Sequence, residues 1–313
     1  MLTRGDTLVE PVASSKLPSS ADSRSRKNDR RDAERLARLA LAGEVSPVWV
    51  PPEQVEGLRE LAQAMDDLAC VREAARQRVN AILCRHGISW DERTPTGRLK
   101  KRWGQHFWNW LRSIDLGDAG SQAAYLAALS AAESAEVAYD ELRARAEGIA
   151  RVSDLGPVID ALMCVKGVGF SSALAFAAEV GDFSRFASGR KVTSYFGLAP
   201  SESSSAESRR LGRISRNGCA LVRKLLIEGA WVLARGNPAC RKRGGTSVPL
   251  AIREHARACS GRLLGRRREL VSRGLMPCKA NTATAAEMAR MLLYIGRDAQ
   301  EAAALAAEVA LVA

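Results

Sequence analysis

The sequence predicts a mainly α-helical protein, and two observations carry this prediction. The composition is 46% hydrophobic but only 5% aromatic, which is typical of Ala- and Leu-rich helices. Apolar residues recur at spacings of three and four over residues 53–86 and again over 121–149, which places them on one face of a helix. At 313 residues the chain has room for two domains, or for one domain with a helical insertion.

The N-terminal residues predict a short strand, then a loop, then a helix. Residues 7–13 are apolar and partly β-branched, and Pro11 favours an edge position because proline cannot donate to a sheet. Residues 14–26 are rich in Ser, Arg and Pro and predict a mobile loop. A helix is expected to begin near Asp29.

The middle of the chain predicts two long helices that pair. Pro51 and Pro52 suit the first turn of a helix, and residues 53–86 form an amphipathic helix longer than most in globular proteins. Residues 121–149 form a matching segment. We interpret the two as an antiparallel coiled coil. An aromatic cap joins them and holds Trp103, His106, Phe107, Trp108 and Trp110.

The last part of the chain predicts a separate helical domain. Gly156 and Pro157 mark its start, and a compact domain with a helix-hairpin-helix is expected to continue to about Arg297. An Ala-rich amphipathic tail follows. The predicted domain limits are 1–52, 53–150, 151–297 and 298–313.

The positive charge is concentrated in one segment. The formal net charge is +12, and residues 190–273 hold 19 Lys and Arg against 5 Asp and Glu, whereas the rest holds 28 basic and 30 acidic residues. A concentrated basic face is typical of a protein that binds DNA or RNA. Binding to a membrane surface is the rival interpretation, but no strongly amphipathic Lys/Arg helix with a Trp/Phe face stands out, so we expect no membrane partner. No apolar run reaches about 18 residues, so no transmembrane helix is expected either. Solvated helix charges are favoured over a nucleic-acid face for Arg72, Arg76, Arg78 and Arg85.

The cysteines and histidines predict neither disulfides nor a zinc site. The seven cysteines are scattered without a CxxC pair, and the three histidines are widely dispersed. This usage is typical of reduced thiols in the cytosol. We therefore expect a cytoplasmic protein associated with the nucleoid.

Lys166, Gly167 and Gly169 are the first candidates for contact with nucleic acid. They lie between two helical patterns, and glycines permit a tight turn there. The free amides at the start of the following helix can bind a phosphate oxygen. The pattern is typical of a helix-hairpin-helix, which grips the DNA backbone without reading its sequence. A purely structural turn explains the glycines equally well, but Lys166 and the basic segment downstream favour phosphate contact.

Asp29 and Asp32 form a candidate metal pair. Their spacing of three residues puts both carboxylates on one face of a helix, and carboxylate oxygens are ligands that Mg²⁺ prefers. The alternative is ordinary capping, since Asp in a first turn complements the helix dipole.

A cluster of small hydroxyl side chains precedes a glycine-punctuated basic run within residues 197–231. A serine that attacks a phosphodiester needs cationic donors beside it, because charge that develops on the phosphoryl group must be neutralised. The alternative is a flexible, Ser-rich surface loop. The candidate nucleophiles and their cationic partners are Ser203, Ser204, Ser205, Arg209, Arg210, Arg213 and Arg216.

Together these segments resemble one family. The Asp29–Asp32 pair, the GVG hairpin and the motifs GDFSRF, YFGLAPSE, GRISRNG and LVRKLL follow one another in the family's order, and a WxxHxxWL-like cap is present. Over about residues 7–296 the chain resembles transposases of the insertion-sequence-110 type, the relatives of Piv invertases. The resemblance implies a RuvC-like α/β domain with four acidic metal ligands, and a C-terminal domain with a serine nucleophile.

The resemblance also implies roles for individual residues. Asp29 and Asp32 match the last two acidic ligands of a Mg²⁺ site. The first two would lie upstream of Met1, so we expect a truncated RuvC-like remnant at the N-terminus.

Ser205 is the expected nucleophile, with Ser204 next and Ser203 third. Ala206 stands where the family has glycine. If that position requires a positive φ, alanine costs on the order of 1 kcal/mol.

The leading hypothesis is a DNA transposase that moves an insertion sequence by serine- and metal-assisted strand transfer. Its expected partners are element-end and target DNA, a structured guide RNA such as family members can use, and further copies of the chain in a homodimer or homotetramer. The alternative is a catalytically inactive DNA- or RNA-binding remnant, favoured by the missing ligands and by Ala206. A third hypothesis is a helix-hairpin-helix repair or recombination accessory protein, which does not require the serine cluster.

Overall fold

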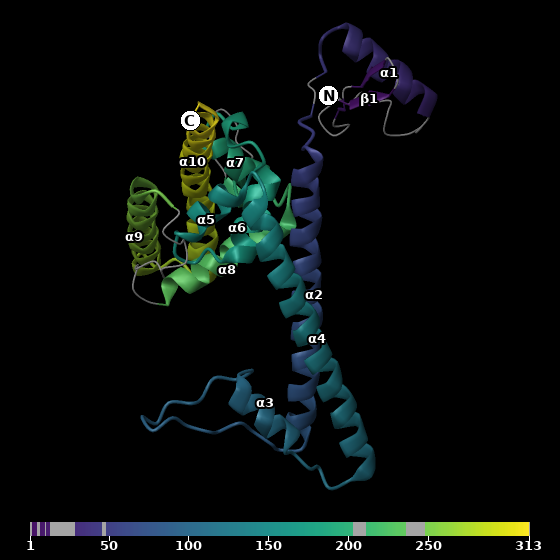
Figure 1. Ribbon diagram of the computed structural model, residues 1–313, viewed down its shortest axis with the longest axis vertical. Helices are drawn as coiled ribbons and strands as arrows, with labels where there is room; N and C mark the ends of the chain where they lie inside the picture. The colour runs from purple at the N-terminus through teal and green to yellow at the C-terminus, as the bar shows by residue number, and fades with distance from the viewer. Residues whose placement is uncertain are drawn as a thin grey trace. The chain divides into compact units, whose positions relative to one another are not determined.

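The protein is mainly helical, as the composition predicts (Figure 1). Its structure, a computed structural model, describes residues 2–4, 7–9, 11–12, 29–45, 48–202, 211–235 and 248–312. The chain divides into two compact units, Met1–Gln54 and Val55–Ala313.

The N-terminal unit contains a small hairpin and one helix. Strand β1 (Leu2–Arg4) pairs antiparallel with β2 (Thr7–Val9), so residues 7–9 of the strand predicted over residues 7–13 are confirmed as a strand. Helix α1 (Asp29–Leu41) carries its two aspartates in the first turn. It ends just before Gly43, whose φ of +69° suits a helix C-terminus.

Two long helices run antiparallel at the start of the larger unit (Figure 1). They are α2 (Glu53–Arg85) and α4 (Ala119–Val152), and they occupy the segments whose spacing predicted them. Asp118 caps α4 by accepting a hydrogen bond from the amide of Ser121 at 2.8 Å. Burial raises the pKa of Tyr125 to about 12, because its ring lies in the seam between the helices.

Aromatic side chains close one end of this helix pair. Helix α3 (Gln105–Arg112) places Phe107 against Trp90, with their ring centroids 5.1 Å apart in an edge-to-face arrangement. The hydroxyl of Tyr125 donates to the carbonyl of Leu111 at 2.7 Å. The end of the pair is therefore a small hydrophobic core of its own.

The remaining elements pack around the last helix. α10 (Pro277–Val312) contacts α5 (Gly156–Met163), α7 (Gly189–Tyr195), α8 (Ala220–Ala234) and α9 (Leu250–Ser272). The other elements are α6 (Phe170–Val180), the 3-10 helix η3 (Phe183–Arg185), and the strands β3 (Pro200–Glu202) and β4 (Leu211–Ile214).

Two of the predicted domain limits fall inside helices. α4 continues past residue 150, and α10 runs without a break through residue 297. The predicted tail is thus the end of α10. The motif GDFSRF is a packing element, because Phe183 lies so close to Gly296 of α10 that any side chain there would overlap its ring.

Candidate nucleic-acid interface

The predicted nucleophile segment is bracketed by two paired strands. β3 and β4 lie antiparallel, with Pro200 opposite Ile214 and Glu202 opposite Leu211. Five predicted residues between them lie outside the described residues: Ser203, Ser204, Ser205, Arg209 and Arg210. The structure therefore locates the two ends of this segment, Glu202 and Leu211, side by side.

Two glycines anchor the base of this hairpin. Gly197 follows α7 and Gly218 precedes α8, and both have a left-handed φ, +64° and +74°. A Cβ on Gly218 would overlap the carbonyl of Tyr195, and one on Gly197 would overlap the backbone of Asn217. Two stretches of main chain thus touch directly, which only glycine allows.

Hydrogen bonds complete this junction. The amide of Ser215 donates to the carbonyl of Ala199 at 2.9 Å, and the amide of Arg216 donates to that of Gly197 at 3.1 Å. Arg223 of α8 donates to the carbonyls of Phe196 and Asn217. The basic motif GRISRNG therefore helps to hold this junction together through its main chain.

Two of the predicted cationic residues remain available at the surface. Arg213 and Arg216 are exposed, and within the described part of the chain neither makes an ion pair. Arg216 has a φ of +59°, an uncommon conformation for a residue other than glycine that marks a constrained position. Both guanidinium groups can meet a polyanion without breaking an internal contact.

The predicted GVG hairpin joins α5 to α6 and packs on α8. Gly167 has a φ of +90°, and a Cβ on Gly229 of α8 would lie 2.6 Å from its carbonyl oxygen. The amide of Lys166 donates to the hydroxyl of Ser260 on α9 at 3.0 Å. Gly169 is the N-cap of α6 and has open space around its Cα. Gly167 is thus needed for packing, whereas Gly169 lies where an anion can approach the helix amides.

Helix α8 connects these two candidate segments. The hairpin leads into its first residue, Ala220, and the GVG turn contacts it at Gly229. Nine residues of helix separate the two points by roughly 14 Å. The segments lie along one helix but do not form a single cluster.

Ion pairs and carbonyl contacts connect α2 to this region. Arg59 of α2 donates to the carbonyls of Ala178 and Glu179 at the end of α6, where the helix dipole favours a cation. Lys224 of α8 pairs with Asp66 of α2 at 2.7 Å, and this hydrogen bond raises the pKa of Lys224.

The thiol of Cys219, the N-cap residue of α8, is half-buried. Burial raises the pKa of Cys219, and nearby Glu179 raises it further. The thiol is therefore protonated at neutral pH.

The candidate metal ligands lie in the N-terminal unit. Asp29 and Asp32 occupy the exposed first turn of α1. Two carboxylates suit Mg²⁺, which usually takes one or two from the protein and completes its shell with water and phosphate oxygens. Over the described ranges no group of three or more His, Cys, Asp or Glu residues could hold a metal ion.

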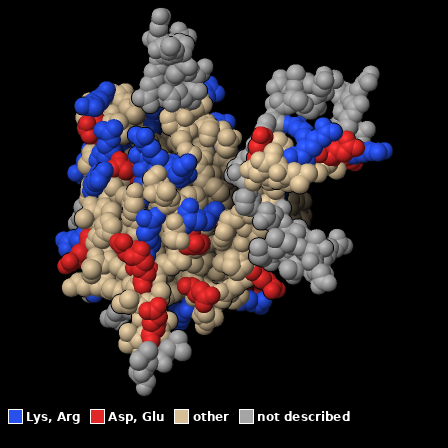
Figure 2. Space-filling model, turned by 90° about the horizontal axis from the view of Figure 1, so that it is seen from above, with Lys and Arg blue, Asp and Glu red and all other residues tan. Residues whose placement is uncertain are grey.

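In Figure 2, Lys and Arg side chains gather in the upper left part of the face drawn, whereas Asp and Glu side chains are scattered over it and most frequent in the lower part. None of the helices in the part of the chain that the structure describes combines the length and apolarity needed to cross a lipid bilayer.

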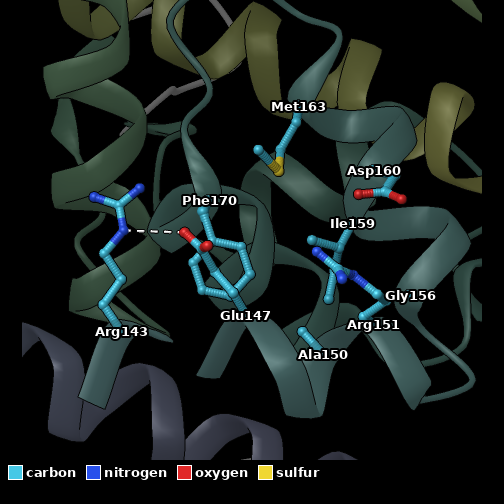
Figure 3. Close-up of a pocket in the computed structure, with 9 residues that line it drawn as sticks. All are labelled: Arg143, Glu147, Ala150, Arg151, Gly156, Ile159, Asp160, Met163 and Phe170. Atoms are coloured by element: carbon cyan, nitrogen blue, oxygen red, sulfur yellow. Dashed lines mark hydrogen bonds and ion pairs between the residues drawn. The ribbon is translucent and has the colours of Figure 1, made fainter. Parts of the chain in front are cut away.

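Sequence reasoning missed a cavity of about 320 Å³ between α4, α5 and α6 (Figure 3). Arg143 pairs with Glu147 at 3.0 Å on one side, and Arg151 and Asp160 lie on the other. Burial raises the pKa of Asp160, against the attraction of Arg151. These residues come from separate helices, so no local motif could have brought them together.

Comparison with known proteins identifies the family. Residues 159–244 match the family model described as "Transposase IS116/IS110/IS902 family", and residues 7–87 match a second model described as "Transposase". The chain is 34% identical over 293 residues to "Putative transposase y4qE" of Sinorhizobium fredii, covering 93% of this chain and 70% of that protein. The chain belongs to the IS116/IS110/IS902 family of transposases.

A second relative supports the assignment. The chain is 27% identical over 219 residues to "Transposase for insertion sequence element IS1111A" of Coxiella burnetii, over 68% of this chain and 56% of that protein. The match to the Sinorhizobium protein spans 93% of this chain, and the two family models match residues 7–87 and 159–244. The resemblance seen in the sequence motifs is thereby confirmed.

Proposed function

We propose that this family member cleaves and joins DNA at the ends of an insertion sequence, with Ser205 as the nucleophile. One observation carries the proposal. In a chain of a transposase family, the serine segment begins and ends at paired strands whose base is anchored on α8, next to exposed Arg213 and Arg216. The paired strands fix where this segment begins and ends, and β4 carries Arg213, which can bind a phosphate.

In the proposed reaction the Oγ of Ser205 attacks a phosphodiester phosphorus. A phosphoserine link to one DNA strand end forms, the P–O bond to the other end breaks, and that end leaves as a hydroxyl. Arg213 and Arg216, with Arg209 and Arg210, neutralise charge on the phosphoryl oxygens. Asp29 and Asp32 would hold a Mg²⁺, which would supply the charge neutralisation that metal ions give to phosphoryl transfer.

The DNA backbone is proposed to lie on the helix-hairpin-helix at Lys166, Gly167 and Gly169 as well. The N-terminal amides of α6 and the Lys166 side chain suit phosphate oxygens. A structured guide RNA would meet the same basic segment, and assembly through the α2–α4 pair as a coiled-coil homodimer or homotetramer would bring two copies to two DNA ends.

A covalent-adduct assay tests this function. The protein is incubated with Mg²⁺, transcribed RNA from the flanks of its own coding region, and labelled DNA carrying those flanks. Adducts are separated on a denaturing gel and their serine is mapped by mass spectrometry. We expect adducts with the unmodified protein, none with Ser205→Ala, and near-normal yield with Ser203→Ala.

Other outcomes overturn part or all of the proposal. Adducts that survive Ser205→Ala and vanish with Ser204→Ala would move the nucleophile by one residue. DNA binding without adducts in the unmodified protein would favour the inactive DNA- or RNA-binding remnant.

A further inference from the structure

The segment at the end of the α2–α4 pair, a loop followed by helix α3, has a composition that packing alone does not require. Residues 98–112 contain five Lys and Arg, four aromatic residues and no Asp or Glu. Basic residues interleaved with aromatic rings are typical of surfaces that bind single-stranded nucleic acid, where cations follow the phosphates and bases stack on the rings.

Hydrogen bonds give this loop a defined course. The indole of Trp90 donates to the carbonyl of Lys100 at 3.1 Å. The amide of Lys100 donates to the carbonyl of Glu92 at 2.8 Å, and the amide of Thr94 donates to that of Arg98 at 2.7 Å. These hydrogen bonds therefore hold the basic residues of the loop beside the aromatic end of the helix pair.

Trp103 marks a constrained point in the same loop. Its φ is +58°, a conformation that is an outlier for a bulky residue and is common at binding sites. Its ring packs against Phe107 and Trp108 with centroid distances of 5.0 and 5.3 Å. The guanidinium of Arg76 lies 4.9 Å from the ring centroid, so cations already meet aromatic faces here.

A cavity of about 420 Å³ opens in this aromatic end. Its volume is within the range of small-ligand sites. The side chains that line it combine rings with hydrogen-bonding groups, and they include Asn80, Ser89, Trp90, Arg102, Phe107 and Trp110. Leu83 and Ile88 also line the cavity, and of its three rings Trp110 is the half-buried one whereas Trp90 and Phe107 are buried. A half-buried indole beside polar groups and one cation suits a planar, polar, phosphate-bearing ligand.

The charges of the loop are unevenly neutralised. Lys100 pairs with Glu92, and Arg112 pairs with Glu133. Three others are exposed and, in the ranges that the structure describes, make no ion pair: Arg98, Lys101 and Arg102. Arg102 lines the cavity, so the cavity carries a positive charge that no ion pair neutralises among the described residues.

Closing the helix pair accounts for only part of this arrangement. Trp90, Phe107 and Leu111 are buried and form the local core. Trp108 and Trp110 are only half-buried, and the cavity beside Trp110 is not filled. A core that served only to join two helices would need neither a cavity nor three exposed cations that make no ion pair with the described residues.

We propose that the aromatic end of the α2–α4 pair binds single-stranded polynucleotide, with one unstacked base in this cavity and adjacent phosphates on Arg98, Lys101 and Arg102. The site is separate from the serine segment, and its ligand is either a single strand of DNA or one of RNA. Its test does not depend on strand transfer.

Photo-crosslinking tests the site directly. The full chain is irradiated with a twelve-nucleotide oligothymidylate carrying 4-thiothymidine, or with oligouridylate carrying 4-thiouridine, and crosslinked peptides are mapped by mass spectrometry. We expect crosslinks within residues 80–112. The stronger of the two arms identifies DNA or RNA as the preferred strand. An unlabelled abasic oligonucleotide should compete roughly tenfold less well than one with bases, because stacking is lost.

Variants keep the test specific. Lys101→Ala with Arg102→Ala should lower this crosslink at least about threefold, whereas Arg102→Lys should retain most of it. Arg145→Ala, an exposed arginine on α4, is the matched control and should change nothing. Crosslinks only outside residues 80–112, or equal competition by the abasic strand, would overturn the proposal.

Discussion

Two regions of the larger unit are held together by opposite means. Around the β3–β4 hairpin, main chain touches main chain through Gly197 and Gly218. At the end of the α2–α4 pair, large rings such as Trp90 and Phe107 pack through their side chains. Backbone contact at these glycines tolerates no added atom. Ring packing leaves a cavity and half-exposed aromatic faces, which suits binding.

The largest expected effect comes from adding one methyl group at the glycine junction. Gly218→Ala forces a left-handed residue to carry a Cβ that overlaps the carbonyl of Tyr195. We expect a loss on the order of 4 kcal/mol in the free energy of unfolding, measured by urea denaturation with circular dichroism.

Gly87→Ala is the matched control at the aromatic end. Gly87 has a similar φ of +68°, but nothing lies within 4 Å of its would-be Cβ. Gly87→Ala should therefore lower the free energy of unfolding only by the cost of a left-handed alanine, about 1 kcal/mol. Equal losses in the two variants would show that backbone approach is not what distinguishes the two regions.

Removing a ring from the aromatic end should lower the free energy of unfolding slightly less than Gly218→Ala does. Phe107 is 1% exposed and touches several other rings, so Phe107→Ala should destabilise by about 3–4 kcal/mol. Trp108→Phe, at a half-buried ring, should cost under about 1.5 kcal/mol. If the Phe107 variant lost less than that control, the rings would not be the core of this end.

Two helix glycines, Gly229 and Gly261, test whether close backbone approach also matters among the C-terminal helices. Gly229→Ala places a methyl group 2.6 Å from the carbonyl of Gly167, and we expect a loss of about 1–3 kcal/mol. Gly261→Ala on α9 meets open space and should raise stability by up to about 1 kcal/mol, because alanine favours helix. Opposite signs are expected in thermal melts, and matching signs would contradict the close approach.

The smallest effect is expected at the cavity of Figure 3, which is lined by α4, α5 and α6 and belongs to neither region. Burial raises the pKa of Asp160 above its ordinary value of 3.8. The folded state therefore favours the protonated carboxyl, and this contribution to stability is present below pH 3.8 and lost as the pH rises through the folded pKa. Asp160→Asn should stabilise the protein at pH 7 by up to about 0.5 kcal/mol.

The pH dependence makes this prediction testable. The difference between Asp160→Asn and the unmodified protein should disappear below pH 3.8, because the protonated acid and the amide are both neutral. Asp140→Asn, on the exposed face of α4, is the control. A less stable Asp160→Asn at pH 7 would mean that attraction to Arg151 outweighs burial.

Much of the fold could be predicted because its signals are local. The apolar spacing within residues 53–86 and 121–149 depends only on the chain near each residue, and α2 and α4 lie there. The same holds for α1 after Asp29 and for the turns at Gly43 and Gly167. The family motifs were also recognisable, because they are ordered along the chain.

The candidate site could be predicted only in part. Its residue types were identified from the sequence, but the pairing of β3 with β4 was not, because these strands are three and four residues long and carry a weak signal. The cation partners of Glu136, Arg72 and Arg76, lie on the facing helix. Nothing near Glu136 in the chain indicates them.

The sequence by itself therefore determined helices α1, α2 and α4, the helical character of the C-terminal part, the basic segment and the family of this protein. Tertiary structure alone decided that Gly167 meets Gly229, that Gly218 meets Tyr195, and that three helices enclose Asp160. The physical reason is that helix periodicity arises from neighbours three and four residues apart. Close packing instead joins residues that are remote in the chain, and it depends on their shapes fitting together.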